Sequence, residues 1–397
     1  MRAIGFTCGI GSMLVGARQA GFDIIGNVEW RKYYHKADEE GKNTFIENFP
    51  GAYLVKNEED LTEEQKKELY GIDLAMGHPE CGNFSNLSCT AQFKKSFAEM
   101  NKDCGDIPIF VNLVRKYKPR FFIQDNLPKS LIGYPMHLWA EALPEYDLFP
   151  EWISNWGYGN IQKFRNRFFM IGALKEEHYV FKPGEKQNTI TTRELLKNLP
   201  KTNHDEHTLV GNTAKGRGVY TEDRHMNWAE YKKYMLQAKD GETLPYKSKD
   251  GTWKKHIGHR KGFKDGYVPV ITGGCPIANP FTGLPFSMRE RCRIQGLPDD
   301  FILYGTIYED DGTWSHYRNM ALVKQTGKCM PVQFCYYVSQ QIADHINGKI
   351  EPYDPKKHTR ILNPNIEVEK AKKWYCDTVG YTNQDGACDF CKGKPCK

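Results

Sequence analysis

Short apolar runs and helical apolar patterns alternate along the first part of the chain. Residues 2–6 and 22–28 are apolar runs, and between them apolar positions recur with helical spacing over residues 13–20. Short runs bounded by glycine or polar residues are typical of buried strands, whereas spacings of three and four residues are typical of a helix. The pattern therefore predicts a strand, a helix and a second strand, in that order.

The same alternation continues as far as residue 123. Apolar runs at 52–55, 73–76 and 120–123 predict further strands, and the patterns of 62–70 and 106–117 predict an exposed helix and an amphipathic helix. Strands that alternate with helices favour a sheet that is covered by helices on both faces. We therefore expect an α/β protein whose main part is a doubly wound mixed sheet.

The pattern changes between residues 175 and 270. Apolar periodicity weakens there, and glycine, lysine, asparagine and threonine become more frequent. Regular patterns return at 286–301, which predicts a helix with Ser287 as its N-cap and its end at Gly296-Leu297-Pro298, and at 332–346. We expect this last helix to pack against the first part of the sheet, with a smaller irregular domain inserted before it. The predicted divisions are 1–174, 175–270, 271–350 and a lysine- and cysteine-rich tail at 351–397.

Residues suited to ligand binding and catalysis follow several of the predicted strands. They are Gly9, Glu29, Asp60, Cys81 and Asp125. In a doubly wound sheet the carboxyl ends of the parallel strands lie at one edge, where such folds bind their ligands. A glycine turn lets a ligand approach the backbone, and an acid about 20 residues further on can bind ribose hydroxyls. An ordinary tight turn is the alternative explanation of the glycines.

Cys81 and Asp125 form a chemically sensible pair. A thiolate is a strong nucleophile, and a carboxyl group can hydrogen-bond to a heterocycle or exchange a proton with it. Arg165 and Arg167, on one face of the strand-like stretch 160–172, can pair with carboxylates or phosphates. The structural alternatives are a buried cysteine, a turn-capping aspartate and a solvated edge strand.

The composition is that of an ordinary globular protein, with 40% hydrophobic and 26% charged residues. The formal net charge of +6 permits a polyanionic partner without requiring one. The sequence contains no apolar run long enough to span a membrane, and residues 1–3 lead directly into a predicted strand. We therefore expect a cytoplasmic protein with reduced thiols and no membrane contact.

Two lysine-rich segments suggest further contacts. In 247–264 basic residues alternate with aromatic ones, which suits the backbone and bases of a nucleic acid, and a solvated loop is the alternative. The nucleic-acid contacts predicted there are Lys254, Lys255, Arg260 and Lys261. In the tail, Cys388 and Cys391 are separated by two residues, as in zinc knuckles, and four thiolates could hold one zinc ion. Unpaired thiols are the alternative. The predicted zinc ligands are Cys376, Cys388, Cys391 and Cys396.

The order of these motifs resembles that of the DNA (cytosine-5) methyltransferases. The resemblance covers most of residues 1–350 and is most specific in RERCRIQGLPDDF at 289–301, which is similar to motif IX of the family. Further similar segments are Pro79-x-Cys81 for motif IV, Asp125-Asn126 for motif VI, Arg165-x-Arg167 for motif VIII, and Gln325-x-Gly327 with Pro331 for motif X.

The resemblance implies an S-adenosylmethionine-dependent enzyme that acts on double-stranded DNA, in a bacterial or phage-infected cell. We expect a monomer, because the sequence shows no coiled-coil or symmetric interface signal. It also implies that 175–270 is a target-recognition domain. The residues implied for the donor site are Thr7, Gly9, Ile10, Gly11, Glu29, Trp30, Asp60, Leu61 and Lys328, and those implied for DNA contact are Glu80, Ser85 and Gln295.

The implied reaction acts on a cytosine that is flipped out of the duplex. Cys81 attacks C6, Asp125 engages N3 and the exocyclic amine, and Arg165 steadies the intermediate, with Arg167 beside it. C5 then takes the alkyl group from the donor. Loss of the C5 proton and expulsion of Cys81 complete the cycle.

Several residues depart from the family pattern. Thr7 replaces phenylalanine, Glu80 proline, Gly82 glutamine, Asp125 glutamate and Lys328 asparagine, and the motif VIII glutamine is one residue further upstream, as Gln162. The smaller Thr7 and the cation of Lys328 suggest carboxy-S-adenosylmethionine as an alternative donor, with 5-carboxymethylcytosine as the product. Methyl transfer remains the default, with Lys328 paired to Glu80, to Asp125 or to a DNA phosphate. A catalytically inactive DNA-binding relative is a third hypothesis, against which the retained Cys81 argues.

Overall fold

The computed structural model describes much of the chain between residues 1 and 352. The described residues are 1–35, 37, 41–80, 106–128, 130, 134, 136–184, 190–199, 219–220, 225–226, 228–247, 253–272, 277–304 and 321–352. At 136–137, 219–220, 225–226, 228, 245–247, 253–259, 321 and 323–324 the description is limited to the backbone. The predicted site residues outside the described part are Cys81, Ser85, Cys376, Cys388, Cys391 and Cys396.

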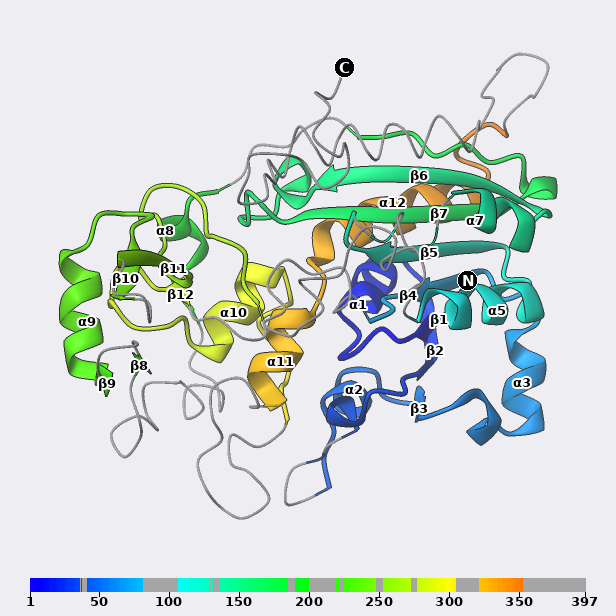
Figure 1. Ribbon diagram of the computed structural model, residues 1–397. Coiled ribbons are helices and arrows are strands. Elements are labelled where there is room, and N and C mark those ends of the chain that lie inside the picture. Colours follow the sequence, from blue (N-terminus) through cyan, green and yellow to red (C-terminus); the bar gives the residue numbers. More distant parts are fainter. Residues whose placement is uncertain are drawn as a thin grey trace.

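A mixed sheet of seven strands forms the larger part of the described structure (Figure 1). Its strands are β1 (Arg2–Phe6), β2 (Asp23–Val28), β3 (Tyr53–Val55), β4 (Leu74–Gly77), β5 (Phe121–Asn126), β6 (Tyr146–Ser154) and β7 (Asn166–Leu174). They lie in the order β3-β2-β1-β4-β5-β7-β6, in which the first five are parallel and β7 is antiparallel to both of its neighbours. The predicted doubly wound mixed sheet is confirmed.

The direction in which the sheet is built reverses between β1 and β4. From β1 the chain moves outward through β2 and β3, and it then returns to place β4 and β5 on the other side of β1. Loops that leave the carboxyl ends of two such strands diverge, and doubly wound folds bind their ligands in the resulting crevice. The glycine loop at 9–11 follows β1, and His78 follows β4 directly, so both lie at this point of the sheet.

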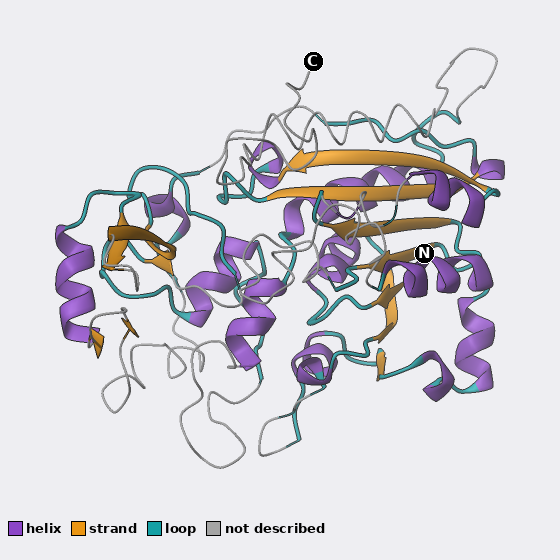
Figure 2. Cartoon of the chain, viewed as in Figure 1, coloured by secondary structure: helices purple, strands orange, loops and turns teal. Residues whose placement is uncertain are grey.

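Helices cover both faces of this sheet, as Figure 2 shows. The helices of this part are α1 (Ser12–Gln19), α2 (Thr44–Asn48), α3 (Glu63–Leu69), α5 (Ile107–Tyr117), α7 (Met136–Ala142) and α12 (Val332–Ile346), with short 3-10 helices η1 (Lys32–Tyr34), η2 (Glu58–Asp60), η5 (Asn155–Tyr158) and η6 (Lys175–Glu177). Phe121 packs in the core under α1 and α12, whereas Phe122 packs in the core under α5 and α7. Because successive strand residues point to opposite faces, the uninterrupted apolar run of β5 fills both cores.

A smaller group of elements lies to one side of the large sheet in Figure 1. Its described elements are α8 (Thr192–Leu195), β8 (Val219–Tyr220), β9 (His225–Met226), α9 (Trp228–Gln237), β10 (Thr243–Lys247), β11 (Trp253–Lys261) and β12 (Ile277–Ala278). Strand β11 is antiparallel to β10 and parallel to β12. Tyr231, Met235 and Leu244 are buried with Ala278 in a small core of this group. In the described part of the chain, no helix has the length and apolar character needed to cross a membrane.

Two helices, α10 (Met288–Gln295) and α11 (Ala321–Lys328), lie between the two groups in Figure 1. The α10 helix begins and ends where its sequence pattern predicts. The Ser287 side chain accepts a hydrogen bond from the backbone nitrogen of Glu290, whose carboxylate accepts one from the nitrogen of Ser287. Gly296 ends the helix with a φ of +81°, which glycine adopts at little cost. The pattern did not predict β6, an edge strand that contains Pro150.

Gly16 lies where α1 packs against α12, and a side chain there should destabilise the fold. A Cβ atom at this position would lie 2.6 Å from the backbone nitrogen of Tyr336, which is closer than such atoms approach. Gly16→Val should therefore lower the free energy of unfolding by about 1–3 kcal/mol, measured by urea unfolding. The matched control is Gln19→Val, at an exposed position of the same helix. Equal stability of the two variants would contradict the prediction.

Candidate active site

The loop after β1 has a conformation that requires glycine. Gly9 and Gly11 have φ angles of +62° and +88°, and a Cβ atom on Gly11 would lie 2.4 Å from the ring of Phe49. Thr7 is buried and has a φ of +65°, which is rare for a β-branched residue. Ile10 is also buried. The predicted donor-site residues of this loop therefore lie at the crevice between β1 and β4.

Glu29, which follows β2 directly, is fully buried and is bound to this loop. Its Oε2 accepts a hydrogen bond of 2.7 Å from the backbone nitrogen of Gly9. Arg31 donates to the same carboxylate from its backbone nitrogen at 3.0 Å, and from Nε and Nη2 at 2.7 Å each. A carboxylate has about four acceptor sites, which is the number of hydrogen bonds that described residues donate to Glu29. A ribose would have to share or displace these bonds to reach Glu29.

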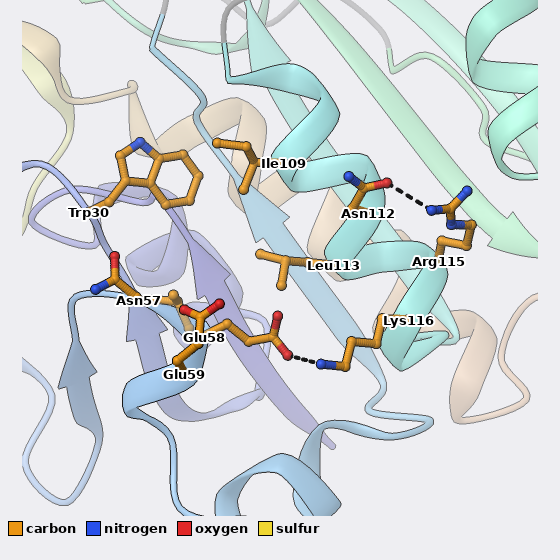
Figure 3. A pocket seen from close by; sticks show the side chains of 10 residues that line it. Trp30, Asn57, Glu58, Glu59, Ile109, Asn112, Leu113, Arg115 and Lys116 are labelled. Atoms are coloured by element: carbon orange, nitrogen blue, oxygen red, sulfur yellow. Dashed lines mark hydrogen bonds and ion pairs between the residues drawn. The ribbon is translucent and has the colours of Figure 1, made fainter.

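A cavity of about 630 Å³ lies between the end of β2, η2 and α5 (Figure 3). Trp30, Ile109 and Leu113 supply apolar walls, and residues 57–59, at the start of η2, line it from the other side. The indole nitrogen of Trp30 donates a 2.8 Å hydrogen bond to Asp106, which fixes the ring. Apolar walls with a polar edge suit a flat heterocycle that carries hydrogen-bonding groups, such as adenine.

Asp60 and Leu61, which were also predicted for the donor site, have other positions. Asp60 is exposed, and its Oδ2 accepts a hydrogen bond of 2.8 Å from the backbone nitrogen of Asn57 in a capping box. Leu61 is buried in the core that α5 covers. Neither belongs to the described residues that line the cavity, whereas Trp30 does.

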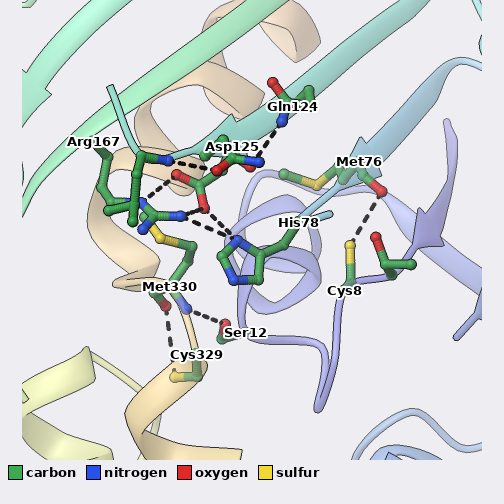
Figure 4. Close-up of polar contacts among 12 residues, drawn as sticks. Cys8, Ser12, Met76, His78, Gln124, Asp125, Arg167, Cys329 and Met330 are labelled. Atoms are coloured by element: carbon green, nitrogen blue, oxygen red, sulfur yellow. Dashed lines mark hydrogen bonds and ion pairs between the residues drawn. The ribbon is translucent and has the colours of Figure 1, made fainter. Parts of the chain in front are cut away.

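Asp125, in β5, is fully buried and holds two side chains from other strands (Figure 4). Arg167 donates from Nε to Oδ1 at 2.8 Å and from Nη2 to Oδ2 at 2.5 Å, a two-point ion pair. Nδ1 of His78 lies 2.5 Å from Oδ2. Burial alone raises the pKa of the Asp125 carboxyl, but the charges of Arg167 and His78 and their hydrogen bonds outweigh it and lower that pKa below its ordinary 3.8. The carboxyl group is therefore ionised at neutral pH.

Arg165, two residues before Arg167, connects three segments of the chain. Its Nη1 donates to the carbonyl oxygen of Ile271 at 2.8 Å, and its Nη2 donates to that of Cys329 at 2.6 Å. These contacts join the start of β7 to the segments that precede α10 and follow α11. The structure therefore shows a connecting role for Arg165, whereas its predicted contact with the reaction intermediate stays a prediction.

Gln295, a predicted DNA contact, lies in the interior. Its Oε1 accepts a 2.8 Å hydrogen bond from Gln162, and its Nε2 donates one of 2.7 Å to the carbonyl oxygen of Thr326. It is fully buried and connects α10 to α11. This position does not support the predicted contact with DNA.

Lys328 and Glu80 form an ion pair at the crevice. Nζ of Lys328 lies 3.1 Å from Oε2 of Glu80 and 5.1 Å from the ring centre of Tyr33. Burial raises the pKa of the Glu80 carboxyl, but the positive charges of Lys328 and Arg31 outweigh it and lower that pKa. Pairing with Glu80 is one of the alternatives that the sequence left open for Lys328.

The predicted DNA contacts of β11 have different exposures. Lys261 is buried, and its Nζ donates to the carbonyl oxygen of Ala238 at 2.7 Å and lies 3.7 Å from Asp240. Arg260 is partly exposed, and Lys254 and Lys255 are described as backbone only. Lys261 therefore binds the backbone at the C-terminal end of α9 in this structure. No cluster of three or more potential metal ligands occurs among the described residues, which exclude the tail cysteines.

Two residues of the site, His78 and Arg31, were not singled out from the sequence. His78 follows β4 directly and lies three positions before Cys81, and Arg31 lies two positions after Glu29. Both are charged or titratable residues beside a predicted strand end, which is the signal that could have identified them.

The fold is similar to that of solved methyltransferases. An Escherichia coli protein encoded within a prophage, described as a DNA modification methyltransferase, superposes with a TM-score of 0.58 at 20% identity, over 87% of this chain and 99% of that chain. The DNMT2 of Spodoptera frugiperda superposes with a TM-score of 0.54 at 11% identity, over 86% of this chain and 99% of that chain. The fold is therefore that of S-adenosylmethionine-dependent DNA methyltransferases.

Sequence similarity identifies the family. The sequence pattern of the C-5 cytosine-specific DNA methylases matches residues 1–344. The type II methyltransferase M.FnuDI of Fusobacterium nucleatum is 23% identical over 374 residues, 88% of this chain and 96% of that protein. M.HindV of Haemophilus influenzae is 26% identical over 231 residues, 57% of this chain and 67% of that protein. The chain belongs to the C-5 cytosine-specific DNA methylase family, which confirms the predicted resemblance.

Asp125→Asn tests how far the fold depends on the buried carboxylate. Loss of its charge leaves Arg167 buried beside a neutral amide, so the free energy of unfolding at pH 7 should fall by about 3–5 kcal/mol. Because the pKa of Asp125 is lower in the folded protein than its ordinary 3.8, the carboxylate stabilises the fold above pH 3.8. This contribution disappears as the pH falls through the lower, folded-state pKa. Urea unfolding between pH 3 and 7 should therefore show a smaller acid-side loss of stability in the variant.

Asp265→Asn is the control for this prediction. Asp265 pairs with Arg193 at an exposed site, where ion pairs contribute little. If Asp125→Asn were as stable at pH 7 as Asp265→Asn, the buried pair would not have the importance that its geometry indicates.

Proposed function

We propose that the protein transfers the methyl group of S-adenosylmethionine to C5 of a flipped cytosine in double-stranded DNA, with Cys81 as the nucleophile. The observation that carries this proposal is the hydrogen bond between Asp125 and His78, because His78 belongs to the turn that leads into Cys81. Three residues of chain span at most about 11 Å. Chain connectivity therefore keeps Cys81 within this distance of His78, whose ring contacts a buried, ionised carboxylate.

The proposed chemistry divides between the thiol and the carboxylate. The thiolate of Cys81 adds to C6 of the cytosine, and the electrons of the C5–C6 double bond make C5 nucleophilic. S-adenosylmethionine supplies the electrophilic methyl group that C5 takes up. Loss of the C5 proton to a solvent water and breakage of the C6–S bond then restore the ring and the thiolate. Because Asp125 is ionised, its oxygens can accept a hydrogen bond from the exocyclic amine of cytosine.

The cavity beside Trp30 supports a nucleoside-containing donor. Its volume of about 630 Å³ and its apolar walls suit the adenine ring, which would lie against the indole of Trp30. The glycine loop would hold the rest of the donor close to the backbone at Gly9 and Gly11. The hydrogen bonds that Arg31 makes with Glu29 would keep this loop in place while the donor binds.

Residues 175–270 are proposed to recognise the target sequence in DNA. The small sheet of this segment presents Arg260 at its partly exposed surface, with Lys254 and Lys255 on the same strand. Positively charged side chains bind the phosphates of DNA and position the protein on the duplex. Arg165 binds the carbonyl oxygen of Ile271, directly after this segment, and so ties its end to the catalytic sheet.

The observed ion pair of Lys328 supports a methyl donor over a carboxylated one. Glu80 already supplies a carboxylate at 3.1 Å from Nζ, so a donor carboxylate would have to replace it. An inactive DNA-binding relative is disfavoured because it would have no use for Cys81 or for a buried Asp125 held by Arg167.

Donor choice tests the proposed reaction. The purified protein and a cytosine-containing DNA duplex are incubated with S-adenosylmethionine or carboxy-S-adenosylmethionine, and the digested nucleosides are weighed by mass spectrometry. We expect 5-methylcytosine alone, and no product from Cys81→Ser. A carboxymethyl product that is lost in Lys328→Asn would contradict methyl-only transfer. DNA binding without any product would instead support the inactive relative.

Trp30→Ala tests the proposed donor cavity. Stacking of a base on an aromatic ring contributes about 1–3 kcal/mol, so the dissociation constant for S-adenosylmethionine should rise by about 5- to 150-fold. Isothermal titration calorimetry measures it. The control is Tyr336→Ala, an exposed aromatic residue on α12, which should bind the donor as the wild type does. Unchanged binding by Trp30→Ala would place the adenine elsewhere.

A further inference from the structure

We propose that the imidazole of His78, and not the carboxyl of Asp125, supplies the proton that N3 of the target cytosine takes when Cys81 adds to C6. This inference rests on the proposed function. It assigns His78 as a catalytic residue and Asp125 as the group that orients it.

The geometry assigns the proton on Nδ1 of His78. This nitrogen lies 2.5 Å from Oδ2 of Asp125 and 3.3 Å from Nη2 of Arg167 (Figure 4). An ionised carboxylate can only accept a hydrogen bond, so Nδ1 must carry a hydrogen and donate it. The guanidinium of Arg167 can only donate hydrogen bonds, and Nδ1 carries a hydrogen, so their 3.3 Å contact is not a hydrogen bond. The bond that fixes the ring is the one from Nδ1 to Asp125. The reactive position of the ring is therefore Nε2.

Asp125 is poorly suited to give a proton itself. Arg167 binds both of its oxygens, and these contacts, with the charge of His78, keep the group ionised. Its side chain is also one methylene shorter than the glutamate that the family pattern has at this position. The imidazole of His78 contacts this carboxylate through Nδ1. Its Nε2 can therefore donate a proton to a base that the shorter side chain of Asp125 does not reach itself.

The charges around His78 come from its own segment and from β5, β7 and α11. Asp125 of β5 and Glu80, two residues after His78, are negative and stabilise a protonated imidazole. Arg167 of β7 is positive and opposes it, and Lys328 of α11, 3.1 Å from Glu80, offsets part of the charge of Glu80. Arg167 forms a two-point ion pair with Asp125. The carboxylate offsets much of the effect of the Arg167 charge on the imidazole. An imidazolium against a buried carboxylate is the arrangement that enzymes use to hold a transferable proton near neutral pH.

The proposed step is balanced. As the S–C6 bond forms, the negative charge that develops over the ring is neutralised by transfer of the Nε2 proton of His78 to N3, which leaves a neutral imidazole. When the C6–S bond later breaks, N3 returns the proton to Nε2. Asp125 remains ionised throughout and keeps its hydrogen bond to Nδ1.

The test compares His78→Asn with the wild type, because the amide of asparagine can keep the hydrogen bond to Asp125 but has no counterpart of Nε2. Single-turnover methyl transfer should slow by about 10²- to 10⁴-fold, with DNA and donor dissociation constants unchanged within about threefold. The wild-type rate should fall as the pH rises and the imidazole of His78 loses its proton, and this fall should disappear in the variant. Thermal unfolding of both proteins verifies that the variant is folded.

A second variant pair tests the reach argument. His78→Gly should be slow, and His78→Gly combined with Asp125→Glu should regain at least tenfold, because the longer carboxyl can occupy the space of the ring. The inference is overturned if His78→Asn transfers methyl groups within threefold of the wild-type rate and with the same pH profile. A double variant no faster than His78→Gly also counts against it. Absence of transfer by the wild type would instead reject the proposed function.

Discussion

The ion pair between Asp125 and Arg167 constrains the arrangement of the sheet around it. A carboxylate in a fully buried position is stable only with a charged, hydrogen-bonded partner, and Arg167 satisfies both of its oxygens. The register pairs Asn126 of β5 with Phe168 of β7, so Arg167 lies just beyond the end of β5. This is possible because β7 runs antiparallel to β5 and begins at the edge where β5 ends. The reversal of one strand thus brings a cation to a site that is otherwise built from the carboxyl ends of parallel strands.

The same strand also connects the site to the rest of the molecule. Arg165 and Arg167 are two residues apart, which places them on one face of the extended chain. Arg167 holds Asp125, whereas Arg165 holds the carbonyl oxygens of Ile271 and Cys329 on the return from the smaller group of elements. Residues that motif similarity connects with the reaction therefore also fix the position of the segments around it.

Local sequence patterns predicted the parallel strands, the glycine loop and the cap of α10, because each depends on residues within a few positions of one another. The roles of Lys261 and Gln295 could not be predicted in this way. Lys261 is buried by carbonyl groups that precede it by more than 20 residues, and Gln295 is bonded to Gln162, 133 residues earlier. His78 is likewise paired with a carboxylate 47 residues away. The pattern showed which residues lie at strand ends, but not which partners each would find there.

The packing of α12 on the sheet has a consequence for synthesis on the ribosome. The face formed by β1, β5 and β7 needs α12 to complete its core, yet the chain between Leu174 and Val332 must first be translated. Translation proceeds at about 5–20 residues per second, so this face of the sheet is made on the order of 10–30 s before α12 is synthesised. A nascent chain with a broad apolar sheet face exposed for this time is a natural client of chaperones. Early folding of the inserted elements would bring the two ends of the catalytic part together and shorten the search for α12.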